Sequence, residues 1–227
     1  MAKPFPHLTD ITGRFDAAII DLDGTLLDSM DLWNRVDIEF LAKRGIELTH
    51  DYTEYVKRTT IREAAEYTVS RDGLKETPED VMDEWNSMVS RAYSQEISCK
   101  RGAAEYIREL HKAGIRLGIA TALVEDNVKA VLKLNGMEDI WDAVLTLDHL
   151  GGTVNKSNPD IYLRTAELMG AVPGRTLVFE DVPEAAAGAR LGGFATCAVF
   201  DEIGCGKCWE AFARECDYSL KDWQNKE

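Results

Sequence analysis

The sequence contains no apolar run approaching the ~20 residues that a membrane-spanning helix requires. Its first fourteen residues also lack the apolar core of a secretory signal. We therefore expect a cytoplasmic protein that does not associate with a membrane. The five cysteines are an odd number, and in a reducing compartment we expect free thiols. The C-terminal cluster of Cys205, Cys208 and Cys216 lacks a fourth metal ligand nearby, so it is assigned no role.

Positive charge is also scarce. Lys and Arg number 26 against 40 Asp and Glu, which gives a formal net charge of −14 at pH 7. An acidic chain is a poor candidate for binding nucleic acid through its overall field. This balance still allows a small anionic substrate to be held by a few local cations. The four histidines match no pairing of a nucleophile with a base.

Five short apolar runs are the strongest structural signal. They are continuous rather than alternating, which is typical of strands buried on both faces of a parallel sheet. They lie at 15–21, 115–120, 143–147, 176–179 and 195–200. Helical patterns alternate with these runs from residue 102 to residue 200. We therefore predict an α/β fold with a doubly wound parallel sheet, similar to a Rossmann fold.

The segment between the first run and the others contains helical patterns only. Helices are predicted near 30–44, 60–69 and 78–93. A helical block at this place in an α/β chain indicates an inserted domain. We therefore predict a core domain of residues 1–28 and 99–227 and a helical domain of residues 29–98.

Reactive side chains follow the ends of four apolar runs. They are Asp21 and Asp23 after the first run, Thr121 after the second, Lys156 in the loop after the third, and Glu180 and Asp181 after the fourth. Taken alone, each of these residues has a simpler interpretation as a turn, helix-cap or surface residue. The carboxyl ends of parallel strands meet at one edge of a sheet, however, so this set is expected to converge.

The chemistry of this set indicates a metal and an anion. Four carboxylates would repel one another without a cation, and oxygen ligands without clustered His or Cys favour Mg²⁺. Lys156 and Thr121 are suited to hold a dianion such as phosphate.

These residues resemble the motifs of the haloacid dehalogenase-like (HAD) hydrolase superfamily. Asp21-Leu22-Asp23-Gly24-Thr25 resembles the first motif, Thr121 the second, Lys156 the third and Glu180-Asp181 the fourth. The helical block resembles the small helical cap of this superfamily. Asn135-Gly136-Met137, Pro159-Asp160-Ile161-Tyr162 and Phe179-Glu180-Asp181 are similar to its β-phosphoglucomutase-like phosphatase branch. Three departures are Ser157, where that branch usually has Pro, Val182, where Ser is common, and Arg190-Leu191-Gly192-Gly193, where Ala-Gly is more usual.

The resemblance implies an Mg²⁺-dependent phosphatase. Asp21 would form an aspartyl-phosphate, and Asp23 would act as general acid and then general base. The metal would be held by Asp21, Asp181 and the Asp23 carbonyl, with Glu180 close by. Phosphate would be bound by Thr121, Ala122 and Lys156, beside Gly24, whose lack of a side chain allows a close backbone approach.

The helical block carries a local basic cluster of Lys57, Arg58 and Arg62. In the family branch a loop near this place selects the substrate, so Arg58 and Arg62 are predicted to contact an anionic substrate; the alternative is a solvated helix start. Trp33 and Trp85 either line the cleft or belong to the core. Mutases of the branch carry a His at the position of Trp33, and its absence favours a phosphatase.

We therefore expect a monomeric phosphatase of a small phosphorylated metabolite, with a sugar phosphate as the expected class. The alternatives are a phosphomutase acting on a hexose phosphate and a non-catalytic protein that binds a phosphorylated ligand.

Overall fold

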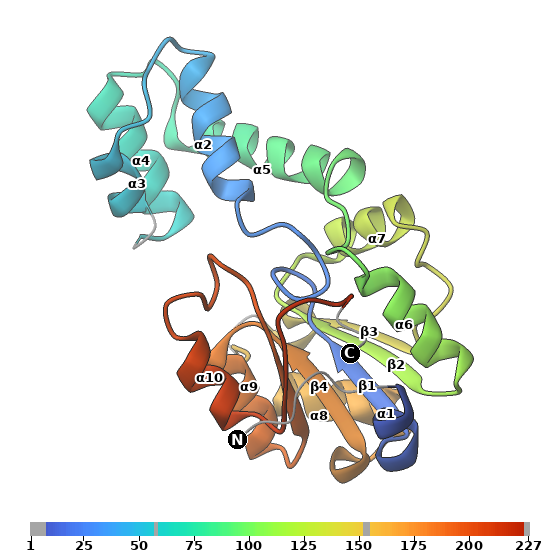
Figure 1. Cartoon of the computed structure of the whole chain (residues 1–227). Helices are drawn as coiled ribbons and strands as arrows, with labels where there is room; N and C mark the ends of the chain where they lie inside the picture. Colours follow the sequence, from blue (N-terminus) through green and yellow to red (C-terminus); the bar gives the residue numbers. More distant parts are fainter. Residues whose placement is uncertain (1–7, 57–58, 152–154, 225–227) are drawn as a thin grey trace. The chain divides into compact units, whose positions relative to one another are not determined.

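The computed structural model describes residues 8–56, 59–151 and 155–224. The chain separates into two compact units (Figure 1). One consists of Met1–Met30 and Ile97–Glu227, and the other of Asp31–Glu96. We call them the core unit and the helical unit. Among the described residues, no helix is both long enough and apolar enough to cross a membrane.

The core unit is built on a six-stranded sheet in which every pair of neighbouring strands is parallel. The strands are β1 (Ala17–Ile20), β2 (Arg116–Thr121), β3 (Ala143–Thr146), β4 (Thr176–Glu180), β5 (Ala195–Val199) and β6 (Tyr218–Leu220). Their order is β3-β2-β1-β4-β5-β6. The chain winds outward from β1 in both directions, which confirms the predicted doubly wound α/β fold. In such a sheet the crevice beyond the carboxyl ends of the central strands is the place for a ligand.

Helices cover both faces of this sheet, because successive side chains of a strand point to opposite sides. They are α1 (Leu8–Arg14), α6 (Ala103–Lys112), α7 (Glu125–Leu134), α8 (Asp160–Leu168), α9 (Pro183–Leu191) and α10 (Trp209–Glu215), with single 3₁₀ turns at Leu147–Leu150 and Pro173–Arg175. Val178 of β4 packs in one apolar cluster with Ile161 of α8. The next residue, Phe179, places its ring 6.3 Å from that of Tyr106 on α6. The sheet is therefore buried on both sides, as its continuous apolar runs predicted.

The described part of the helical unit contains four helices. They are α2 (Leu32–Ala42), α3 (His50–Val56), α4 (Ile61–Asp72) and α5 (Pro78–Gln95). Capping boxes start α4 at Thr60 and α5 at Thr77, and each satisfies backbone N–H groups that the first helical turn leaves unpaired. The sequence analysis missed α3. This helix has seven residues, of which only Tyr52 is buried, so it has no apolar periodicity to detect.

Candidate active site

Lys156 joins two carboxylates that emerge from neighbouring strands. Asp21 follows β1 and Glu180 ends β4, and these strands pair directly. The Lys156 Nζ atom lies 2.5 Å from Asp21 Oδ1 and 2.5 Å from Glu180 Oε1. The lysine side chain is 12% exposed, and the two acidic side chains are 7% and 0% exposed. The structure thus brings together three of the residues that the sequence singled out, as a buried ion-pair network.

Asp181 completes a group of three acidic side chains. Carboxylate oxygens of Asp21, Glu180 and Asp181 all lie within 4.8 Å of one another. Glu180 Oε2 and Asp181 Oδ2 are buried and have no hydrogen-bond partner among the described residues. Buried polar atoms are almost always paired. Two unpaired oxygens in an all-carboxylate cluster therefore fit a hard divalent cation such as Mg²⁺.

The electrostatics of the cluster also favours a bound cation. Burial raises the pKa of both Glu180 and Asp181, and the charge of Asp21 raises each further, while Lys156 opposes the shift. Burial also acts against the charge on Lys156, but Asp21 and Glu180 outweigh it and raise the pKa of the lysine. The lysine therefore stays charged. One lysine in contact with this group leaves it short of positive charge, and a bound divalent ion would favour the ionised carboxylates.

The turn after β1 wraps around Asp181. Thr25 Oγ1 donates a hydrogen bond to Asp181 Oδ1 at 3.2 Å. Gly24 has a φ of +76°, and a Cβ atom at this position would lie 2.3 Å from Asp181 Oδ2. Only glycine fits here, because both the backbone conformation and the space exclude a side chain. Asp23 is partly buried and its Oδ1 accepts a hydrogen bond from Ser29 Oγ at 2.6 Å.

Thr121 and Ala122 lie at the end of β2, the other neighbour of β1. The Thr121 side chain is buried, and its Oγ1 accepts a hydrogen bond from the Leu123 N–H at 3.1 Å. Ala122 is exposed in the turn that follows. The hydroxyl thus shapes this turn, and the predicted role of both residues in binding phosphate stays a prediction.

Tyr162 forms a hydrogen bond with Glu180. The sequence analysis gave this tyrosine no role. It is a fully buried residue of α8, and its hydroxyl donates to Glu180 Oε1 at 2.7 Å. Glu180 Oε1 therefore has two donors, Tyr162 and Lys156. Only Oε2 is left without a partner in the described chain.

Asp201 fixes the loop after β5 beside the acidic cluster. It follows β5, and its Oδ2 lies 2.9 Å from Lys100 Nζ. Its Oδ1 accepts from the N–H groups of Ile203 and Gly204, each at 2.9 Å. A Cβ atom on Gly204 would lie 2.5 Å from Asp181 Oδ2. Asp201 thus holds a loop whose backbone packs closely against Asp181. Its position directly after a strand was the signal that could have identified it from the sequence.

The predicted anion-binding cluster in the helical unit is only partly visible. Arg58 lies outside the described residues. Arg62 forms an ion pair with Glu79 at 2.7 Å, and both side chains are more than half exposed. Its charge is therefore already paired with an acidic neighbour, and its contact with a substrate stays a prediction.

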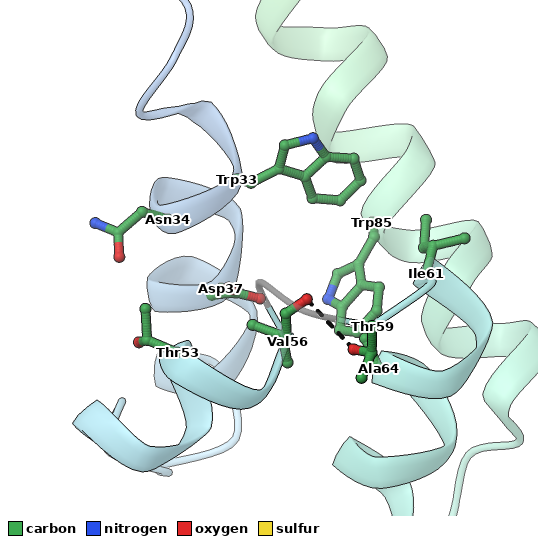
Figure 2. A pocket seen from close by; sticks show the side chains of 9 residues that line it. All are labelled: Trp33, Asn34, Asp37, Thr53, Val56, Thr59, Ile61, Ala64 and Trp85. Atoms are coloured by element: carbon green, nitrogen blue, oxygen red, sulfur yellow. Dashed lines mark hydrogen bonds between the residues drawn. The ribbon is translucent and has the colours of Figure 1, made fainter. Parts of the chain in front are cut away.

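A cavity of about 360 Å³ lies within the helical unit (Figure 2). It is lined by Trp33, Asn34, Asp37, Thr53, Val56, Thr59, Ile61, Ala64 and Trp85. Trp33 is 49% exposed, whereas Trp85 is buried and its Nε1 has no partner in the described part of the chain. Trp85 also packs edge-on against Phe40, with ring centroids 5.5 Å apart. This residue is therefore both a core residue and part of the cavity wall.

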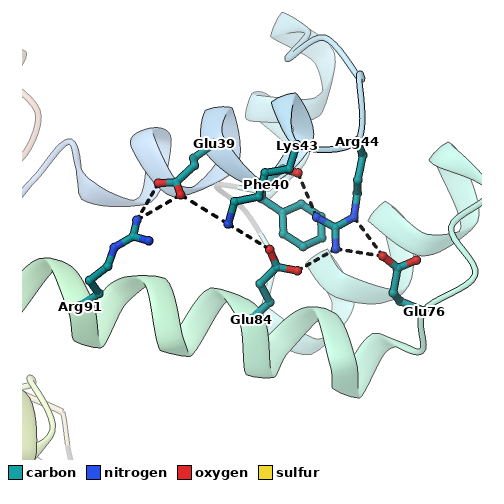
Figure 3. Close-up of polar contacts among 7 residues, drawn as sticks. All are labelled: Glu39, Phe40, Lys43, Arg44, Glu76, Glu84 and Arg91. Carbon is teal, nitrogen blue, oxygen red and sulfur yellow. Dashed lines mark hydrogen bonds and ion pairs between the residues drawn. The ribbon is translucent and has the colours of Figure 1, made fainter.

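A network of ion pairs joins α2 and the residues after it to α5 and a residue before it (Figure 3). Arg44 follows α2 by two residues and lies 2.9 Å from Glu76, which precedes α5, and 2.7 Å from Glu84 of α5. Its guanidinium also lies over the ring of Phe40, 3.7 Å from the centroid. Exposed ion pairs contribute less than about 1 kcal/mol each, but Arg44 is only 17% exposed. The network therefore fixes α2 against α5 more firmly than single surface pairs would.

Asp37 makes the helical unit sensitive to pH. Burial raises its pKa to about 6, although a hydrogen bond from Tyr52 acts against the shift. The folded protein thus binds this proton more tightly than the unfolded chain. The stabilisation is complete below the ordinary pKa of 3.8 and is lost as the pH rises through about 6. Asp37→Asn is therefore expected to raise the free energy of unfolding by about 2–3 kcal/mol at pH 7.

Urea denaturation at several pH values measures this effect. The advantage of Asp37→Asn over the wild type should shrink as the pH falls from 7 toward 4. Asp51→Asn is the matched control, because the Asp51 side chain is fully exposed. An advantage that is constant over this pH range would show that Asp37 is not the titrating group.

Comparison with known proteins places this geometry in a family. The family model of the haloacid dehalogenase-like hydrolases matches residues 18–199, which contain every residue of the acidic cluster. The chain belongs to the haloacid dehalogenase-like hydrolase family. Its relatives in this family include phosphatases and phosphomutases. The predicted membership is thus confirmed.

Individual relatives cover most of the chain. It is 27% identical over 220 residues to the protein CbbY of Rhodobacter capsulatus, covering 92% of this chain and 91% of that protein. It is 26% identical over 219 residues to a β-phosphoglucomutase of Mycobacterium bovis, with 83% and 82% covered. Crystal structures of CbbY from Rhodobacter sphaeroides, with phosphate and with xylulose-1,5-bisphosphate, match with TM-scores of 0.71 and 0.72. They are 24% and 23% identical and cover 93% of this chain and 96% of those chains, so this likeness shows the fold.

Proposed function

We propose that the protein is an Mg²⁺-dependent phosphatase of a small phosphorylated metabolite, with a sugar phosphate as the expected class. The observation that carries the proposal is the buried contact of Asp21 with Lys156 inside a three-carboxylate group. This arrangement offers a nucleophile, a cation for the phosphoryl group and ligands for a metal ion. The xylulose bisphosphate bound to a CbbY structure supports the substrate class.

In the proposed reaction Asp21 is the nucleophile. One of its oxygens forms a bond to phosphorus while the bond to the leaving oxygen breaks, and Asp23 gives that oxygen a proton. Asp23 then takes a proton from water, which attacks phosphorus and frees both Asp21 and inorganic phosphate. Mg²⁺, held by Asp21, Asp181 and the Asp23 carbonyl with Glu180 nearby, would neutralise charge shared by the nucleophile and the substrate.

The other core residues bind the phosphoryl group in this proposal. Lys156 would place its ammonium against an equatorial oxygen, where negative charge is spread in the transition state. Thr121 and the backbone at Ala122 would donate to the remaining oxygens. Ser29 holds the Asp23 carboxylate through its hydrogen bond and so limits the directions in which the proton can move.

The helical unit is proposed to be the cap domain that selects the substrate. Its Trp85 N–H, which has no partner among the described residues, and the Asp37 carboxyl offer polar groups inside a largely apolar cavity. Arg58 and Arg62 would add positive charge at the substrate. We further propose that the enzyme is cytoplasmic, in agreement with five free cysteines, and that it acts as a monomer.

Phosphorus NMR separates a phosphatase from a phosphomutase. A mutase must keep water from its aspartyl-phosphate, and Trp33 cannot exchange a proton at neutral pH as a histidine would. With β-glucose 1-phosphate, Mg²⁺ and a trace of the 1,6-bisphosphate, we expect net release of inorganic phosphate. Glucose 6-phosphate that appears faster than phosphate would establish the mutase alternative.

Two further results test the enzyme class. A panel of phosphorylated metabolites should give turnover that EDTA stops and Mg²⁺ restores. Beryllofluoride with Mg²⁺ should raise the melting temperature, because it binds the native state only. A melting shift with no turnover on the whole panel would favour a non-catalytic protein that binds a phosphorylated ligand.

A further inference from the structure

The segment after β6 places Trp223 in the core, against the end of the strand that carries Glu180. Trp223 is 3% exposed. Its ring stacks on Phe179 with centroids 5.5 Å apart and planes 25° apart, and it lies 5.6 Å from the ring of Tyr106. Phe179 directly precedes Glu180 and Asp181. Trp223 lies beyond residue 199, where the match to the family model ends.

The indole N–H reaches the turn after β1. Trp223 Nε1 donates a buried hydrogen bond to the carbonyl oxygen of Thr25 at 3.2 Å. Thr25 is completely buried. Its own N–H donates to the carbonyl of Leu22, and its hydroxyl donates to Asp181 Oδ1, each at 3.2 Å. Each polar group of Thr25 is therefore used, and among the described residues Trp223 is the donor to its carbonyl.

The core leaves room for this segment at Gly102. This glycine has a φ of +84°, and a Cβ atom on it would lie 2.7 Å from Gln224 Cγ and 3.2 Å from the carbonyl carbon of Trp223. The Gln224 N–H donates to Asp222 Oδ1 at 2.8 Å. Trp223 is thus held in place by a local turn and by a close backbone approach.

We propose that Trp223 is a positioning residue for the metal site, an inference that rests on the proposed Mg²⁺-dependent function. Its indole N–H fixes the Thr25 carbonyl and so aims the Thr25 hydroxyl at Asp181 Oδ1. Asp181 Oδ2 is then left without a protein donor in the described chain and free to bind the ion. The stack on Phe179 steadies the strand end from which Glu180 and Asp181 emerge.

An isosteric replacement in the full chain tests the role of the N–H group. In 3-benzothienylalanine a sulfur replaces the indole N–H, so the shape stays and the donor is lost. At position 223 we expect the Mg²⁺ dissociation constant, measured by isothermal titration calorimetry, to rise about five- to tenfold, as for the loss of one hydrogen bond. Catalytic turnover should return to the wild-type level at high Mg²⁺. The same replacement at Trp141 is the control, because its buried Nε1 has no partner among the described residues.

The outcomes separate this inference from the proposed function. A wild-type protein that binds no Mg²⁺ would overturn both. A wild type that binds Mg²⁺, with a variant at position 223 that binds it equally well, would overturn the positioning role alone. Nitrogen-15 NMR of the wild type gives a second test that needs no variant. Saturation with Mg²⁺ should shift the Trp223 Nε1 resonance more than that of Trp141, and equal or absent shifts would also contradict the inference.

Discussion

Replacing Asp21 by asparagine is expected to lower phosphate release by at least ~10⁴-fold, as for the loss of a covalent nucleophile. An amide cannot form the aspartyl-phosphate. The fold should remain intact, because Lys156 keeps its contact with Glu180 at 2.5 Å and one carboxylate fewer relieves repulsion in the cluster. Steady-state kinetics measures the loss, and circular dichroism checks the fold.

Asp16→Asn is the matched control. Asp16 precedes β1 and forms an exposed ion pair with Arg175 at 2.5 Å, a contact whose loss costs less than about 1 kcal/mol. This variant should keep wild-type turnover. Turnover of Asp21→Asn within tenfold of the wild type would exclude Asp21 as the nucleophile.

Lys156→Met is expected to have the second-largest effect. The lysine is in contact with both Asp21 and Glu180. Removing one partner of a buried ion pair costs about 3–5 kcal/mol, so the metal-free variant should lose about this much free energy of unfolding. Loss of a cation at the phosphoryl group should lower kcat by about 10²–10³-fold.

Mg²⁺ should stabilise this variant more than it stabilises the wild type, since the ion then replaces the missing positive charge. Denaturant titrations with EDTA and with Mg²⁺ measure the difference. Lys129→Met is the control, because Lys129 pairs with Glu125 on the surface and is 67% exposed. A Lys156→Met variant with unchanged stability and turnover would contradict the assigned network.

The sheet and the acidic cluster could be predicted because both follow from local sequence. Buried parallel strands appear as continuous apolar runs, and the reactive side chains lie directly after those runs. Asp21 and Glu180 are far apart in sequence, yet β1 and β4 pair. The general rule that strand ends converge was therefore enough to bring them together.

The supporting contacts could not be predicted, because sequence periodicity carries no information on pairing between distant side chains. Tyr162 appeared as an ordinary helical residue, and its hydroxyl contact with Glu180 depends on the packing of α8. The contact of Trp223 with Thr25 spans 198 positions. The elements α1, α10 and β6 were also missed, because they have seven, seven and three residues and show no usable period.

Trapping the aspartyl-phosphate tests the central claim most directly. In Asp23→Asn with p-nitrophenyl phosphate and Mg²⁺, the good leaving group needs no acid, whereas hydrolysis of the intermediate lacks its base. We expect a burst of one equivalent of nitrophenolate, followed by slow turnover. Borohydride reduction during the burst should convert Asp21 to homoserine, which peptide mass spectrometry locates. Phosphate release without a burst, or a modification at another residue, would contradict catalysis through Asp21.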